Sequence, residues 1–147
     1  MANETFAIDI VSDYAEVRRV GEWLAGIGKG RISAAVLDDL QLVVAEALNN
    51  IIRHAYREEP GQPVSVRLDR APDSITLLFR DSGRAAPPGF PEARVGSLDV
   101  DPSDLAALAD SGRGLAIIHS CVDQVSYVRN GSVNELRLSL RLDGRKR

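Results

Sequence analysis

The sequence predicts an α+β fold in which helices cover one face of a single mixed, mostly antiparallel sheet. Strand-like segments come mostly in pairs joined by short turns, helical patterns occupy stretches of their own, and no internal repeat or linker interrupts the chain. A length of 147 residues suits one domain that buries a sizeable core. We therefore expect a two-layer sandwich that takes up residues 1–147 as a single domain.

The composition narrows the class of protein. Apolar residues make up 44% of the chain and charged residues 27%, as in ordinary globular proteins. A formal net charge of −3 argues against direct binding of nucleic acid through phosphate neutralisation. The start shows no secretory signal, and no apolar run is long enough to span a membrane. Cys121 is the only cysteine, which excludes an internal disulfide, so we expect a cytoplasmic protein.

The first 57 residues indicate one strand followed by two helices. Alternating apolar residues predict a strand over residues 5–11. Ser12 or Asp13 caps the first helix, which ends near a pair of glycines. Ser33 caps the second helix, which continues to residue 57 without Gly or Pro.

The second helix has an apolar face and a polar row. The apolar face comprises Leu37, Leu40, Val44, Leu48, Ile51 and Ala55. Glu46, Asn50 and His54 follow one another at intervals of four residues on another side, so their side chains could act together on one ligand. The alternative is that this row is the solvated side of an amphipathic helix. The apolar neighbours Val43 and Ala47 raise doubt about that alternative.

A hairpin follows the second helix. Residues 63–68 and 74–80 have the pattern of two strands, and Ala71-Pro72-Asp73 joins them. The second strand leads directly into Asp81-Ser82-Gly83. A carboxylate at a strand end can accept a hydrogen bond from an exocyclic amine, and a glycine lets a flat ring approach the backbone. The alternative is an ordinary Asp-x-Gly turn.

Residues 84–111 have no regular pattern. Prolines and glycines forbid a long element there, and acidic residues gather. Asp101 looks like a cap for a short helix with Pro102 at its first position, over residues 102–109. Loops of this length in a small domain are usually functional lids or disordered segments. We expect a lid that is mobile without a ligand and closes over phosphate.

The end of the chain predicts a helix and a second hairpin. Gly112-Arg113-Gly114 opens a helix that reaches about residue 121. Glycines at a helix start expose amides at the positive end of the helix dipole, where phosphate is favoured, although two glycines alone are weak evidence. Strands over residues 124–129 and 133–142 follow, turned by Asn130-Gly131.

The polar row suits phosphate chemistry that depends on magnesium. The amide oxygen of Asn50 is a hard, neutral ligand for a magnesium ion that already holds phosphate oxygens. Glu46, one turn earlier, could accept a proton from an attacking hydroxyl or water. The chain has neither a P-loop nor a strand ending in the dinucleotide fingerprint.

The order of these motifs resembles the Bergerat-type nucleotide-binding domain of the GHKL ATPase superfamily. The three stretches that carry the resemblance are AEALNNIIRHAY, DSG, and SGRGLAII followed by Asp123. The resemblance covers nearly the whole chain. Within the superfamily, a single short domain is similar to the anti-sigma-factor serine kinases of bacterial partner-switching systems.

The resemblance implies roles at the phosphate end of an ATP site. Glu46 would be the general base and Asn50 the magnesium ligand. His54 matches a residue frequent in the family, with either a helix-packing or hydrogen-bonding role or an accessory catalytic one. The lid hinge and the phosphate-facing amides would come from Ser111, Gly112, Arg113, Gly114 and Leu115.

The resemblance also implies roles at the adenine end. Asp81 would hold the adenine amino group, with Gly83 packed close to the ring. The family usually has a threonine near the start of its last strand, and Asn134 takes that position here. The lid, residues 84–111, matches no family pattern, so its phosphate contacts have no assignment.

The function implied is that of an ATP- and magnesium-dependent serine kinase and anti-sigma factor. Its partners would be a sigma factor and a STAS-type antagonist protein that it phosphorylates. The alternative is an ATP-binding interaction module without phosphotransfer, and a plain ATP hydrolase is a weaker third hypothesis. We also expect a homodimer formed through the first strand and the helix that carries Trp23, unless Trp23 fills the core of its own chain.

Overall fold

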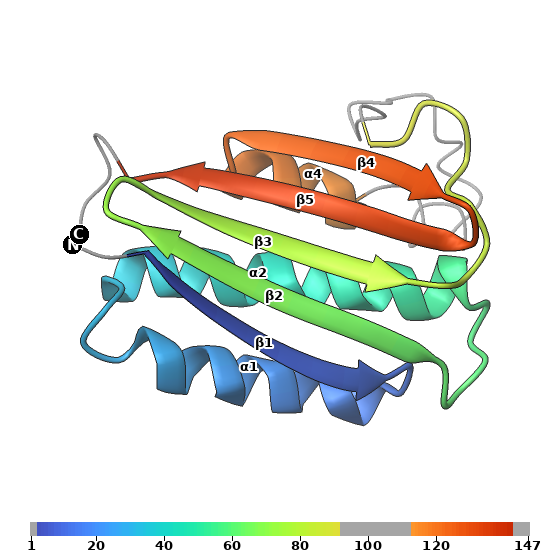
Figure 1. Cartoon of the computed structure of the whole chain (residues 1–147), viewed down its shortest axis with the longest axis horizontal. Helices are drawn as coiled ribbons and strands as arrows, with labels where there is room; N and C mark the ends of the chain where they lie inside the picture. Colours follow the sequence, from blue (N-terminus) through green and yellow to red (C-terminus); the bar gives the residue numbers. More distant parts are fainter. Residues whose placement is uncertain (1–2, 92–112, 143–147) are drawn as a thin grey trace.

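Five strands form one sheet within residues 3–91 and 113–142, the part of the chain that the computed structural model describes. The strands are β1 (Glu4–Val11), β2 (Pro63–Ala71), β3 (Ser74–Asp81), β4 (Gln124–Asn130) and β5 (Val133–Arg141). They lie in the order β1-β2-β3-β5-β4, and every neighbouring pair is antiparallel. Figure 1 shows the sheet with β1 and β4 at its edges.

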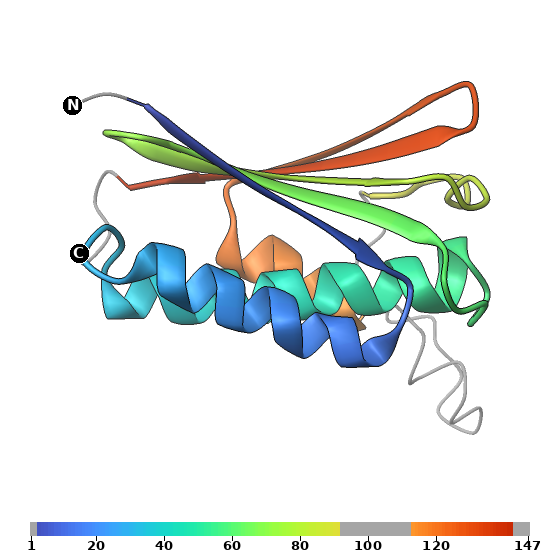
Figure 2. The same ribbon diagram turned by 60° about the horizontal axis from the view of Figure 1, so that its bottom comes forward.

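Helices cover one face of this sheet. They are α1 (Tyr14–Gly28), α2 (Ala34–Asn50) and α4 (Arg113–Cys121). Figure 2 shows them in a layer beneath the sheet, and α2 lies between α1 and α4. The predicted two-layer α+β sandwich is therefore confirmed. The short helix predicted at residues 102–109 lies outside the described residues.

Side-chain caps set the starts of the first two helices. Asp13 accepts a hydrogen bond from the amide of Ala15 at 3.0 Å, so it is Asp13 and not Ser12 that caps α1. The Ser12 hydroxyl instead donates to the carbonyl of Glu59. Ser33 caps α2 as predicted, since its hydroxyl accepts from the amide of Val36.

The prediction of one regular helix up to residue 57 is wrong. The α-helical pattern ends at Asn50 and is followed by a π-helical turn, η1 (Ile51–Ala55), closed by a 3.0 Å hydrogen bond from the amide of Tyr56 to the carbonyl of Ile51. Arg57 and Glu58 then adopt left-handed φ angles of 51° and 67°.

Contacts distant in the sequence account for this wider turn. The buried Tyr56 hydroxyl donates to the carbonyl of Pro63 at 2.6 Å and accepts from the amide of Ser82 at 2.7 Å. Arg84 donates from its amide to the carbonyl of Ala55 and from Nε to the carbonyl of His54. These bonds hold the segment after α2 against the loop after β3. Helix propensity of the local sequence does not encode such long-range bonds.

The hydrophobic core lies between the two layers. Its largest fully buried side chains include Leu24, Leu40, Leu48, Leu68, Ile75, Leu77, Phe79, Ile118, Leu138 and Leu140. Cys121 is buried and free, as expected of a small core residue. Trp23 is half-buried and packs against the same core, while the homodimer stays a prediction.

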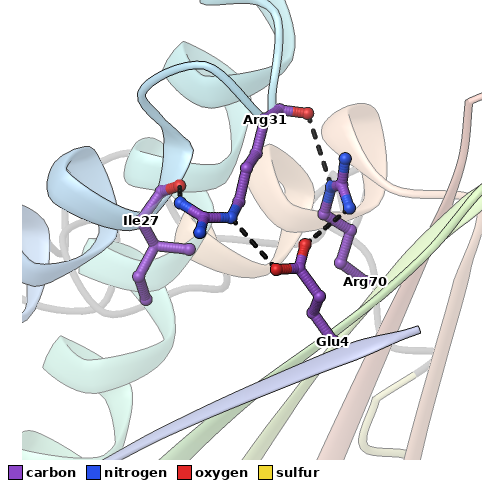
Figure 3. Close-up of polar contacts among 4 residues, drawn as sticks. All are labelled: Glu4, Ile27, Arg31 and Arg70. Carbon is purple, nitrogen blue, oxygen red and sulfur yellow. Dashed lines mark hydrogen bonds and ion pairs between the residues drawn. The ribbon is translucent and has the colours of Figure 1, made fainter. Parts of the chain in front are cut away.

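A polar cluster joins the two layers at one end of the sheet. Glu4 on β1 accepts from Arg70 of β2 at 2.6 Å and from Arg31 of the α1–α2 loop at 3.2 Å (Figure 3). Arg31 also donates to the carbonyl of Ile27, and Arg70 donates to the carbonyl of Arg31. Since β2 runs antiparallel to β3, this cluster lies at the end of the sheet opposite to the end of β3.

Candidate functional site

Asp81 ends β3 as a buried carboxylate, only 6% exposed. Its Oδ1 accepts hydrogen bonds from the amide of Gly83 at 2.9 Å and from Nδ2 of Asn134 at 2.8 Å. Burial raises the pKa of Asp81, and the bonds from Asn134 and Gly83 and the charge of Arg129 oppose that rise without cancelling it. Oδ2 makes no hydrogen bond within the described part of the chain, so it remains available as an acceptor.

Asn134, on β5 opposite Asp81, is buried at 3% exposure and fully hydrogen-bonded. Besides Asp81, its Nδ2 donates to the carbonyls of Gly83 at 3.2 Å and Arg84 at 3.0 Å. The structure thus brings Asn134, the residue at the predicted threonine position, into direct contact with the predicted adenine-binding carboxylate.

Gly83 packs against the end of η1. A Cβ added to Gly83 would lie 2.5 Å from the carbonyl oxygen of Ala55, closer than real Cβ atoms approach. Arg84, the next residue, donates from its amide to that same oxygen. This close approach to the Ala55 backbone requires glycine at position 83. It is a second reason for the glycine, beside the approach of a ring that the sequence suggested.

Glu46 lies on α2 beside the first turn of α4. A Cβ on Gly114 would come within 2.6 Å of Glu46 Oε1. Glu46 is half-buried, as is Asn50 one helical turn later at the end of α2. Partial burial of both residues is less than full solvation, and the role of the polar row stays a prediction.

Some of the remaining predicted site residues lie within the part of the chain that the structure describes, and others lie outside it. Leu115 is buried in α4, and His54 is half-buried within η1, where its carbonyl accepts from Arg84. Arg113 is the first residue of α4, and its side chain is not described; Ser111 and Gly112 lie outside the described residues.

Three residues of this region were missed from the sequence. Tyr127 and Arg129 of β4 both donate to Asn134 Oδ1, at 2.6 and 2.8 Å, and Tyr56 fixes the amide of Ser82. For Arg129, the Asn130-Gly131 signal predicted the hairpin but not its register. With these two residues as the turn, Arg129 would pair with Ser132, whereas the structure turns at Gly131-Ser132 and pairs Arg129 with Asn134.

A depression of about 540 Å³ opens beside this region. It is lined by Ala55, Tyr56, Arg57, Glu59, Gln62, Ser82, Gly83 and Arg84. It shares Ser82 and Gly83 with the candidate site but includes neither Asp81 nor Glu46. The hydrogen bonds and the Glu46–Gly114 contact therefore define the site better than this hollow does.

These contacts belong to an α+β sandwich in which η1 packs against the loop after β3, and the last third of α2 packs against the first turn of α4. Residues 10–140 match the family model of the histidine kinase-like ATPase domain. The chain belongs to this family, as the resemblance predicted. The domain of this family implies the use of ATP.

The curated relatives that the chain matches are named as serine-protein kinases. The chain is 26% identical over 98 residues to the serine-protein kinase RsbW of Staphylococcus aureus (strain MRSA252), covering 66% of this chain and 61% of that protein. It is 23% identical over 100 residues to the RsbW of Bacillus cereus (strain B4264), covering 68% and 61%. The matched region thus spans about three fifths of the length of these relatives.

A solved structure shares the fold. The crystal structure of the SiaB–SiaC complex from Pseudomonas aeruginosa contains a chain with a TM-score of 0.61 at 16% identity, and the match covers 92% of this chain and 88% of that one. At this identity the likeness shows the fold alone. Within the described residues, no helix is both long and apolar enough to cross a membrane.

Proposed function

We propose that this protein is an ATP- and magnesium-dependent serine kinase of a partner-switching system, which phosphorylates an antagonist protein and sequesters a sigma factor. The observation that carries the proposal is the Glu46 carboxylate held against Gly114 in the first turn of α4. A base beside a helix start is placed where a terminal phosphate and an incoming hydroxyl would meet.

Each predicted residue has a chemical task in this proposal. Asp81 Oδ2 accepts a hydrogen bond from the adenine amino group. Asn50 offers its amide oxygen to a magnesium ion whose other ligands are phosphate oxygens and water, a role that a neutral, half-buried amide fits. Magnesium, when bound, neutralises phosphate charge. The amides at the start of α4 face the phosphates.

The transfer step needs little covalent chemistry from the protein. Glu46 accepts the proton of the serine hydroxyl while the oxygen bonds to the γ-phosphorus and ADP leaves. The phosphoserine product carries the phosphoryl group, and the proton stays on Glu46 until solvent removes it. The relatives named as serine-protein kinases support the kinase activity. The antagonist protein and the sigma factor come from the family resemblance and are part of the proposal.

The test compares wild type with Glu46→Gln, which keeps the size and hydrogen bonding of the side chain. Labelled ATP is mixed with the protein and candidate antagonists, and ATP affinity is measured by calorimetry. We expect Glu46→Gln to bind ATP nearly as wild type does and to phosphorylate about 10²–10⁴-fold more slowly.

Asn50→Ala and Asp81→Ala serve as binding-site variants beside it. Both should fold yet lose ATP affinity, Asn50→Ala chiefly through its magnesium dependence. Wild-type ATP affinity in both would overturn the nucleotide site. ATP binding without phosphotransfer in the wild type and Glu46→Gln would instead support the interaction module.

A further inference from the structure

We propose that Tyr127 and Arg129 are positioning residues that fix the orientation of the Asn134 amide and so make the site select a base with an exocyclic amine over one with a carbonyl. The inference rests on the proposed nucleotide site and adds two β4 residues to it. Neither residue belongs to the three motifs that the sequence suggested.

The orientation of the Asn134 amide is set by its neighbours. Its Nδ2 faces three oxygen acceptors, on Asp81, Gly83 and Arg84, whereas its Oδ1 faces the Tyr127 hydroxyl and Nη1 of Arg129. A guanidinium can only donate, so Arg129 tolerates an oxygen at this position and not an NH₂ group. A rotated amide would also place Oδ1 against three other oxygens.

The Tyr127 hydroxyl is itself oriented. It accepts a hydrogen bond from the amide of Ala86 at 2.9 Å, which leaves its hydrogen directed at Asn134 Oδ1, 2.6 Å away. The Tyr127 ring meets Phe90 edge to face, with ring centroids 5.1 Å apart. The ring therefore has its own packing, and the hydroxyl can be removed without moving the ring.

The amide orientation decides what Asp81 presents to a base. With Nδ2 toward it, Asp81 Oδ1 accepts two N–H groups, and Oδ2 is left as an acceptor. With the amide rotated, an oxygen would face Asp81 Oδ1, which favours a proton on this buried carboxyl. A protonated Asp81 would donate, and a donor suits a base carbonyl.

The experiment measures ATP and inosine triphosphate affinities by calorimetry, because inosine has a carbonyl where adenine has its amine. The variants are Tyr127→Phe, Arg129→Met and the double variant. We expect the ATP preference of the double variant to fall about tenfold, as suits hydrogen bonds to a charged group. Side-chain amide signals of Asn134 in nuclear magnetic resonance spectra, slow to exchange in wild type, should exchange faster.

Two matched variants serve as controls. Tyr14→Phe removes an exposed hydroxyl bonded to Glu58, and Arg67→Met removes an exposed pair with Asp69. Both should keep the wild-type preference. Equal loss of affinity for both nucleotides in the β4 variants would make Tyr127 and Arg129 merely structural and overturn the inference. A wild type that binds neither nucleotide would overturn the proposed function itself.

Discussion

The carboxylate of Glu46 occupies space that a side chain at position 114 would need: a Cβ on Gly114 would lie 2.6 Å from Glu46 Oε1. The contact joins the last third of α2 to the first turn of α4. Gly114, the second residue of α4, therefore does more than expose an amide, because its missing side chain leaves the space in which the proposed base rests.

Gly114→Ala should displace the Glu46 carboxylate without unfolding the protein. The colliding atom is the far end of a flexible side chain, which can rotate away at little cost. Because a catalytic group misplaced by about 1 Å can lose about 10²-fold in rate, we expect phosphotransfer to fall by that order. Kinetics of antagonist phosphorylation measure the rate of phosphotransfer, and a thermal melt measures whether the fold keeps its stability.

Gly26→Ala is the matched control for that change. Gly26 lies exposed in α1, and an added Cβ would meet nothing within 4 Å. Alanine should therefore leave phosphotransfer unchanged and stabilise the fold by about 0.5–1 kcal/mol. Normal phosphotransfer by Gly114→Ala would contradict the role of the Glu46–Gly114 contact.

Gly83→Ala should behave differently from Gly114→Ala. The added Cβ would meet backbone atoms of Ala55 at 2.5 and 2.6 Å, and backbone cannot rotate away. We expect a loss of about 1–3 kcal/mol in the free energy of unfolding, measured with denaturant. A stability equal to that of Gly114→Ala would show that the loop after β3 does not pack on η1 as described.

Tyr56→Phe tests the bridge between the end of α2 and the loop after β3. The variant leaves the carbonyl of Pro63 and the amide of Ser82 without their buried partner, so we expect a loss of about 1–3 kcal/mol in unfolding free energy. Tyr14→Phe, whose hydroxyl is exposed, should change it by less than about 0.5 kcal/mol. Equal stabilities of the two variants would refute the bridge.

Local signals predicted the elements of this fold well. Caps at Asp13 and Ser33, alternating strands and the hairpin that turns beside Asn130 are encoded within a few residues of where they act, although the hairpin turns at Gly131-Ser132 instead of Asn130-Gly131. The family resemblance assigned Asp81 and Asn134 to the same end of the site, but the hydrogen bond between them was not predicted. The roles of the predicted site residues in nucleotide binding stay predictions.

What escaped prediction depends on contacts between distant segments. The turn η1 is held by bonds from Arg84 and by the bridge through Tyr56. Tyr127 reaches Asp81 through Asn134 only because β5 lies between β3 and β4. No local periodicity states that strand order, since it comes from non-local pairing.

The last prediction concerns the charge of Asp81, for which Asp81→Asn is the informative change. Asparagine can keep the acceptor used by Gly83 and Asn134 but places an NH₂ group where Oδ2 stands. ATP affinity should therefore fall by about tenfold or more, measured by calorimetry at neutral pH. The free energy of unfolding should rise, because burial raises the pKa of Asp81 and its ionised form opposes folding.

The pH dependence of stability distinguishes a gain caused by removing the Asp81 charge from a gain that is independent of this charge. Between the ordinary pKa of an aspartate and the raised pKa of Asp81, the native state binds more protons than the unfolded state, so stability falls as pH rises through that window. The advantage of Asp81→Asn should appear across the window and level off above it.

Asp69 gives the opposite case: burial opposes the shift, yet bonds from Arg67 and Thr5 lower its pKa. Asp69→Asn should therefore lose stability at neutral pH and lose less as pH falls through that lowered pKa, in melts between about pH 3 and pH 8. A wild type more stable than Asp81→Asn at neutral pH would show that Asp81 is held charged at no cost.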